Sequence, residues 1–122
     1  MRFRSHQHLR RNRDFQAVRA EGRRVQCGVF LFRAFLRTGD DVFPSAPRLG
    51  VITSRRVGPA VVRNLLRRRM REIFRAHQAT LRPDVDIVVV MRAGAARLPY
   101  SELEQRLLQA FQKSGAQRGI DG

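Results

Sequence analysis

The sequence predicts one α+β domain, a sandwich in which helices cover a small sheet. Its 122 residues suit a single hydrophobic core. Residues 59–77 have the apolar spacing of an amphipathic helix, and strand-like segments at 48–54 and 87–91 stand on either side of it. A strand–helix–strand unit places its strands parallel in one sheet, with a right-handed crossover in about 98% of cases. The expected order is helix, two or three strands, helix, strand, helix.

Both ends of the chain are predicted to be flexible. Residues 1–8 show no periodicity, which indicates a basic arm. The tail over 114–122 is rich in glycine, which favours disorder. His6 and His8 lack a third ligand nearby, so we expect no metal site in the arm.

A short helix is predicted over 14–20. Asn12 or Asp14 can cap it with a side-chain oxygen. Phe15 and Val18 are three residues apart and therefore share one side of the helix.

Alternating apolar residues predict extended structure over 23–37, and Gly28 marks a bulge or a break between two short strands. One alternate set is wholly apolar and is expected to face the main core: Phe30, Phe32, Ala34 and Leu36. The other set is expected to line a less buried face: Val29, Leu31, Arg33, Phe35 and Arg37.

The remaining segments follow simple patterns. Residues 38–47 hold Gly, Pro and Asp, which predict a connecting loop. The run at 87–91 is continuously apolar, as in a strand buried on both faces. A final helix is predicted over 99–113, with Ser101 and Glu104 as a capping box. Its apolar stripe is Tyr100, Leu103, Leu107, Leu108 and Phe111.

The helix over 59–77 has two chemically different faces. The apolar face is expected to dock on the sheet: Val62, Leu66, Met70, Ile73, Phe74 and His77. The opposite face carries Arg63, Asn64, Arg67, Arg68, Arg71 and Arg75, and Glu72 is the only acid in the helix. Arginines four residues apart repel one another by roughly a few tenths of a kcal/mol per pair. Such a row favours a polyanionic partner, and a solvated face is the alternative.

Composition narrows the class of function. The formal net charge is +15, and all but one of the 25 basic residues are arginine, whose planar fork binds phosphate and stacks on bases. The only cysteine, Cys27, excludes an intramolecular disulfide and is expected to be a small core residue. No apolar run approaches the length of a membrane span, so we expect a protein of the cytoplasm.

Catalytic equipment is sparse in the sequence. Two-metal nucleases need several convergent carboxylates, and the candidates are Asp84 and Asp86, which flank the start of the apolar strand. Both fit simpler roles in a turn and at a strand edge, and His77 falls on an apolar helix face. We therefore expect no catalytic residue and no bound cofactor or metal, with a metal-dependent nuclease using the two aspartates as the alternative. Candidates for base stacking are Phe15, Phe35 and Tyr100.

The segment 48–72 carries a long motif. It contains RLGVITSRRVG, then AVVRN, then further arginines and a final Arg-Glu. This string resembles the protein subunit of bacterial ribonuclease P, whose pattern is G-hydrophobic-x-V-S-K-K-x-G-x-A-V-x-R-N-R-x-K-R-x-x-R-E. The resemblance extends to LRRNRDFQAV at 9–18 and to the strand at 86–92, and it covers roughly 9–113.

The chain departs from that pattern at three places. Leu65 stands where the family has the second arginine of Arg-Asn-Arg. Arg19 stands where the family often has an aromatic residue. Ile52 and Thr53 replace a small or polar residue followed by valine.

The resemblance implies a function. In that family a large RNA carries the catalytic centre and its Mg²⁺ ions, and the complex removes the 5′ leader from precursor tRNA. The implied partners are ribonuclease P RNA and precursor tRNA, with no membrane association and a monomeric protein as accessory subunit. The implied fold is a ribosomal-protein-S5-domain-2-like sandwich over residues 1–122, whose β-α-β crossover is left-handed, against the general rule.

The resemblance also implies two binding sites. The residues expected to bind the catalytic RNA are Arg55, Arg56, Arg63, Asn64, Arg67, Arg68 and Arg71. The leader is expected in a cleft between the first helix and the sheet, lined by Phe15, Arg19, Leu31, Arg33 and Ser54. Phe15 lies in a matching motif, whereas Leu31 and Arg33 rest on strand alternation. A structural RNA-binding protein of the ribosome is the remaining alternative.

Overall fold

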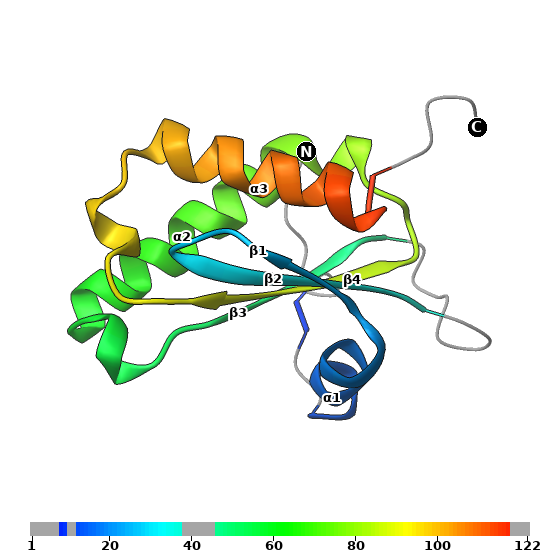
Figure 1. Ribbon diagram of the computed structural model, residues 1–122, viewed down its shortest axis with the longest axis horizontal. Helices are drawn as coiled ribbons and strands as arrows, with labels where there is room; N and C mark the ends of the chain where they lie inside the picture. Colours follow the sequence, from blue (N-terminus) through cyan, green and yellow to red (C-terminus); the bar gives the residue numbers. More distant parts are fainter. Residues whose placement is uncertain (1–7, 10–11, 38–45, 118–122) are drawn as a thin grey trace.

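A computed structural model describes residues 8–9, 12–37 and 46–117 (Figure 1). The helices are α1 (Asn12–Glu21), α2 (Ala60–His77) and α3 (Tyr100–Ser114), and the strands are β1 (Arg23–Gln26), β2 (Phe30–Leu36), β3 (Arg48–Ile52) and β4 (Val85–Met91). Short 3₁₀ turns are η3 (Arg55–Val57), η4 (Gln78–Thr80) and η5 (Ala95–Arg97). The predicted loop over 38–47 lies mostly outside the described residues. None of the helices in the described ranges is long and apolar enough to cross a membrane.

The four strands form one sheet in the order β1-β2-β4-β3. β1 and β2, and likewise β2 and β4, are antiparallel, whereas β3 and β4 are parallel across the α2 crossover. The mixed α+β architecture and the parallel pair predicted from the sequence are therefore confirmed. Figure 1 shows α2 and α3 on one face of the sheet and α1 on the other. The hand of the crossover stays a prediction.

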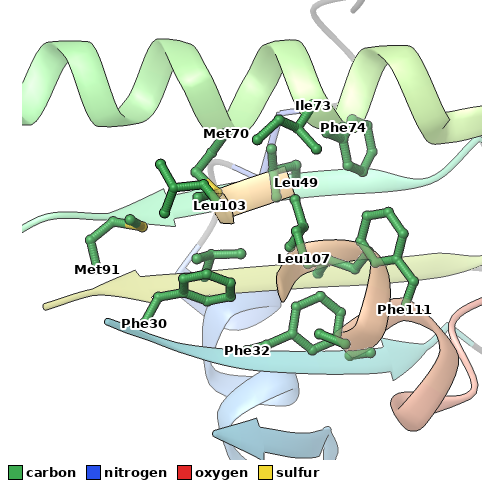
Figure 2. Packing of buried hydrophobic residues seen from close by; sticks show 14 of the residues in the cluster. Phe30, Phe32, Leu49, Met70, Ile73, Phe74, Met91, Leu103, Leu107 and Phe111 are labelled. Carbon is green, nitrogen blue, oxygen red and sulfur yellow. The ribbon is translucent and has the colours of Figure 1, made fainter. Parts of the chain in front are cut away.

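The main core lies between the sheet and the helices α2 and α3. Figure 2 shows the apolar side chains of both layers pointing toward one another. The fully buried members include Phe30, Phe32, Leu66, Met70, Ile73, Phe74, Leu103, Leu107 and Phe111. The predicted apolar face of α2 is thus confirmed. On α3 the stripe holds except at Tyr100, which is exposed because it is the first residue of the helix.

A tight turn joins β1 to β2. Gly28 has a φ of 78°, a left-handed conformation that favours glycine. The Cys27 N–H donates to the Phe30 carbonyl oxygen at 3.0 Å and closes the hairpin. Gly28 therefore breaks the segment into two strands, which was one of the two predicted outcomes. Cys27 is half-buried against the main core.

Strand alternation fails at the end of β2. Leu36 was expected in the core but is 37% exposed, since it lies at the strand end next to the last turn of α3. Arg37 was expected on a less buried face but is 3% exposed. Its guanidinium donates to the Asp86 carboxylate at 2.6 Å and to the carbonyl oxygens of Ala46 and Pro83 at 2.9 Å. These bonds satisfy the buried cation. The expected burial of Leu36 and the expected exposure of Arg37 were therefore both wrong.

Two predicted helix starts were also imprecise. α1 begins at Asn12, two residues earlier than expected. At α3 the predicted capping box is wrong: Pro99 is the N-cap, no side chain caps the helix, and Ser101 lies within it. Glu104 instead pairs with Nε2 of the half-buried His77 at 2.9 Å, which ties α3 to the end of α2. His77 is therefore a structural contact between helices.

Both chain ends are more ordered than predicted where they are described. His8 forms a parallel bridge with Leu49, and the N–H of the buried Leu9 donates to the Leu49 carbonyl oxygen at 3.1 Å. At the other end Ala116 belongs to the main core, and Gln117 forms a bridge with Leu81. The predicted arm is thus wrong at His8 and the predicted tail is wrong over 114–117. Residues 1–7 and 118–122 lie outside the described part.

A buried ion cluster joins three segments at the end of the sheet where β2 ends and β3 and β4 begin. Asp86 on β4 is 2% exposed. Its two carboxylate oxygens accept hydrogen bonds from Nε and Nη2 of Arg48 at 2.7 and 2.6 Å. Its Oδ1 also accepts from Nη1 of Arg37. One carboxylate therefore holds two guanidinium groups from different parts of the chain.

We predict that Asp86→Asn lowers the free energy of unfolding by about 3–5 kcal/mol, because the buried Arg37 guanidinium then loses its ion pair with the Asp86 carboxylate. Urea denaturation followed by circular dichroism measures this. The control is Asp84→Asn, since Asp84 pairs with Arg82 at 3.5 Å near the surface and its loss should change stability by less than about 1 kcal/mol. Equal small effects of both substitutions would contradict a structural role for the Asp86 cluster.

Candidate nucleic-acid interface

The outward face of α2 is a row of arginines. Arg68 and Arg71 are exposed, and Arg63 and Arg67 are half-buried. Arg68 lies 3.6 Å from Glu72. Among the described residues, no acid lies within ion-pair distance of Arg63, Arg67 or Arg71. The positive charge of this face is therefore nearly uncompensated inside the protein.

Two further arginines extend this face beyond the helix. Arg55 and Arg56 are exposed in η3, while Val57 between them and α2 is buried and anchors the turn. Gly58 has a φ of 150°, and a Cβ there would lie 3.1 Å from a Val62 methyl group. The turn thus sits tightly on the first turn of α2 and places its arginines beside the helix row.

Asn64 and Leu65 behave differently from the arginines. The side-chain oxygen of Asn64 accepts a hydrogen bond from Nη1 of Arg67 at 3.2 Å. Asn64 therefore orients that arginine and does not cap the helix, whose N-cap is Pro59. Leu65 is half-buried, and the neighbouring Val61 is 79% exposed. An apolar strip consequently borders the arginine row where the family pattern has an arginine.

A groove lies on the opposite face of the sheet, beside α1. It is a cavity of about 380 Å³. Its lining consists of Asn12, Phe15, Gln16 and Arg19 from α1 and of Leu31, Arg33, Ile52, Val88 and Val90 from three strands. The floor is aliphatic, and two arginines stand at its side. Such a groove offers apolar contacts for bases and cations for phosphates.

Strand register explains the floor of the groove. Val90 pairs with Leu31 on one side and with Ile52 on the other, so these three side chains form one row across the sheet. In the adjacent row Val88 pairs with Arg33 and with Gly50. Side chains of β2 and β4 that alternate away from the main core therefore meet below α1.

Four of the five residues predicted for the cleft line this groove: Phe15, Arg19, Leu31 and Arg33. Ser54 does not line it. Ser54 is exposed and precedes η3 as its N-cap, next to the arginine face. Because β3 leads directly from Ile52 to Ser54, this residue lies between the two surfaces along the chain.

The sequence interpretation missed five lining residues: Asn12, Gln16, Ile52, Val88 and Val90. Asn12 and Gln16 are one helical turn apart, a spacing that could have identified them once Phe15 was chosen. Val88 and Val90 were assigned to a strand buried on both faces. That assignment holds for Val88 at 4% exposure, whereas Val90 is half-buried because α1 does not reach over it.

The aromatic stacking candidates differ in environment. Phe15 borders the groove and also packs against the small cluster of Leu9, Val18 and Val88 below α1. Phe35 is half-buried beside the same cluster, and Tyr100 is exposed at the other face of the sheet. Phe15 is thus the one of these three stacking candidates that lines the groove.

Among the described residues, three side chains have a shifted pKa. Burial raises the pKa of the Cys27 thiol, which keeps it protonated and weakly nucleophilic. Burial and then two nearby glutamates raise the pKa of Tyr100. The pKa of Arg48 is raised first by its hydrogen bond to Asp86, against the opposing effect of burial. These shifts all move away from neutral pH, so none of the three groups is poised for acid–base catalysis.

The carboxylates offer little to a metal ion. The oxygens of Asp86 are already engaged by two guanidinium groups, and Asp84 lies 3.5 Å from Nε of Arg82. Over the described ranges, no three His, Cys, Asp or Glu side chains come together as metal ligands. The two guanidinium groups therefore occupy the carboxylate oxygens of Asp86 that the nuclease alternative would need for a metal ion.

Comparisons with known proteins agree on one family. A family model described as Ribonuclease P matches residues 3–115. A protein of Exiguobacterium sibiricum named "Ribonuclease P protein component" is 33% identical over 107 residues, which cover 88% of this chain and 89% of that protein. A protein of the same name from Syntrophobacter fumaroxidans is 38% identical over 111 residues, covering 90% and 89%.

Solved structures extend the comparison to the fold. The RNase P protein from Thermotoga maritima superposes with a TM-score of 0.74 at 29% identity, covering 87% of this chain and 96% of that one. The RNase P protein from Staphylococcus aureus has a TM-score of 0.79 at 24% identity, covering 92% and 98%, and supports the fold alone. The matched segment spans both the arginine face and the groove. The chain belongs to the ribonuclease P protein family.

Proposed function

We propose that this chain is the protein subunit of ribonuclease P and helps to remove the 5′ leader of precursor tRNA. The observation that carries the proposal is an uncompensated arginine face in a member of this family, on a molecule that also has a groove suited to a single strand. The subunit is proposed to act as a monomer with an RNA partner. Family membership supports the reaction, and the two surfaces support the division of labour described below.

The arginine face is proposed to bind ribonuclease P RNA. Its residues are Arg55, Arg56, Arg63, Asn64, Arg67, Arg68 and Arg71. Guanidinium groups that lack internal counter-ions gain most from phosphate oxygens, because no existing ion pair has to break. Asn64 supports the face by orienting Arg67.

The groove is proposed to hold the 5′ leader. A single strand has exposed base faces and a phosphate on every residue, and the groove has an aliphatic floor with Phe15 at its edge. Arg19 and Arg33 are available for phosphates. Ser54, which lies outside the groove, is proposed only as a contact between the groove and the arginine face.

The chemical step is proposed to belong to the RNA and to Mg²⁺ ions that the RNA holds. The protein then needs no nucleophile and no general base. Engagement of the Asp86 carboxylate by arginines supports this assignment, since that group is committed to the fold.

Reconstitution tests the function directly. Precursor tRNA, ribonuclease P RNA and Mg²⁺ at low salt should give slow cleavage, and adding this protein should accelerate it. The protein without RNA should leave the substrate intact, which gel electrophoresis of end-labelled precursor measures. Cleavage by the RNA-free protein that Asp86→Asn abolishes in a folded variant would favour the nuclease alternative instead. A different co-purifying RNA would favour a ribosomal role.

We predict that Arg67→Ala weakens binding to ribonuclease P RNA and makes the slope of log affinity against log salt shallower by roughly 0.7–0.9, the value for one lost phosphate contact. Filter binding at several salt concentrations measures both. The wild-type slope should be roughly −4 to −5 for about six contacts. Residual cleavage by the RNA alone at high Mg²⁺ should persist.

The matched control is Arg24→Ala. Arg24 is an exposed arginine on β1, the edge of the sheet opposite β3, and its loss removes the same charge. It should leave the salt slope almost unchanged. Equal losses in both variants would mean that net charge, and not the α2 face, drives RNA binding.

We predict that Arg19→Ala weakens binding of leader-bearing precursor tRNA to the holoenzyme by about tenfold, the lower end of the range for a charge-assisted contact, and leaves binding of leaderless tRNA unchanged. The fold should survive because the contact between Arg19 and Arg33 uses the Arg19 carbonyl oxygen. Arg13→Ala is the control, since Arg13 is exposed on the same helix but does not line the groove. A loss that is independent of the leader would remove Arg19 from the groove assignment.

A further inference from the structure

The position of α1 determines the groove, because α1 covers only part of the second sheet face. Three rows of side chains cross that face. The first row is the open floor, with Val90 between Leu31 and Ile52; the second has Val88 between Arg33 and Gly50; the third has Asp86 between Phe35 and Arg48. Moving α1 by one row would either close the groove or remove its wall. Something must therefore fix the helix over the second and third rows.

One contact to α1 comes from the ion cluster of the third row. Arg48 uses Nε and Nη2 to hold Asp86, which leaves Nη1 facing the helix. This nitrogen lies 3.5 Å from Oδ2 of Asp14 in the first half of α1. Both side chains are largely buried, at 16% and 13% exposure. Asp14 is thus the helix end of a chain of charges that begins at Arg37 in the interior.

A second contact is the seat of Phe15, the residue next to Asp14. A Cβ atom at Gly50 would lie 2.7 Å from Cε1 and Cζ of the Phe15 ring, closer than real Cβ contacts come. The same Cβ would lie 3.2 Å from the Cβ of Leu9. The ring therefore rests on the bare backbone of β3, and only glycine leaves that space.

A third contact fixes the other end of the helix. Nη1 of Arg33 on β2 donates to the carbonyl oxygen of Arg19 in the last turn of α1 at 2.7 Å. A cation at a helix C-terminus also interacts favourably with the helix dipole. With Asp14 held at one end and Arg19 at the other, the helix cannot tilt without breaking one of the two contacts.

We propose that Asp14 is a positioning residue for leader binding: through Arg48, which Asp86 holds in place, it fixes α1 so that Phe15 rests on Gly50 and the groove keeps its width. The inference rests on the proposed function of the groove. It assigns to an acidic residue, beside a surface for a polyanion, a favourable effect on RNA binding. Simple electrostatics gives the opposite sign, since removing an acid should strengthen RNA binding.

This difference in sign makes a sharp experiment. Asp14→Asn and Glu21→Gln each remove one negative charge from α1 and keep the side chain nearly the same size. Glu21 is exposed, and in the described part of the chain it forms no ion pair. The measurements are dissociation constants of the reconstituted holoenzyme for leader-bearing precursor tRNA and for leaderless tRNA, with the melting temperature of each variant.

We expect Asp14→Asn to raise the dissociation constant for leader-bearing substrate by about threefold or more, the scale of a partly exposed ion pair, with leaderless tRNA and ribonuclease P RNA bound as before. Glu21→Gln should bind both substrates as tightly as wild type or slightly more tightly. Asp14→Glu, which keeps the charge, should restore much of the discrimination. Gly50→Ala, which displaces the Phe15 ring without changing any charge, should also lose affinity selectively for the leader-bearing substrate.

The outcomes distinguish a failure of the groove assignment from a failure of the positioning role of Asp14. If wild type binds leader-bearing and leaderless tRNA equally, the groove assignment falls and the inference falls with it. If wild type binds leader-bearing tRNA more tightly than leaderless tRNA, and Asp14→Asn and Gly50→Ala keep the same ratio of dissociation constants as wild type, only the positioning role is overturned. A loss by Asp14→Asn that is equal for both substrates and follows its melting temperature would show a general structural role and would also overturn the proposal.

Discussion

The buried carboxylate of Asp86 is the interaction on which the arrangement of this fold depends. It lies on β4, an interior strand between β2 and β3, and it holds Arg37 from the end of β2 and Arg48 from the start of β3. Replacing such a cluster with apolar residues is often neutral for stability, so its value lies in specificity. An unpaired guanidinium in the interior is costly, and this cost disfavours any strand register that separates the three residues.

The two faces of the sheet receive unequal cover, and this inequality creates the groove. On one face α2 and α3 together bury a continuous core of phenylalanine and leucine side chains (Figure 2). On the other face α1 has only ten residues and buries a small cluster around Val18. Its contacts fall on the rows of Val88 and Phe35, so the row of Leu31, Val90 and Ile52 keeps an open side. The groove is thus a consequence of an incomplete second layer.

Periodicity and a family motif together predicted much of this structure. The two faces of α2, the buried strand β4 and four of the nine groove residues follow from the spacing of apolar side chains or from that motif. The failures occur where a distant part of the chain decides. Arg37 is buried because it pairs with Asp86, which lies 49 residues away in the sequence. Leu36 is exposed because of where α3 ends. Ser54 was assigned from a motif, but a strand end directs it away from the groove. Local alternation contains no information on which helix covers which row.

Arginine has two different roles in this chain, and the partners of each side chain separate them. Arg37 and Arg48 bind the Asp86 carboxylate, whereas Arg33 gives one of its N–H groups to a carbonyl oxygen of α1. The arginines of η3 and α2 find almost no internal acid in the described residues and face outward. The formal net charge of +15 is therefore larger than the charge available on the arginine face, because some of the arginines stabilise the fold. Guanidinium groups from the sheet hold α1 in place. On α2 the same group has almost no acidic partner among the described residues, which leaves it available for phosphate.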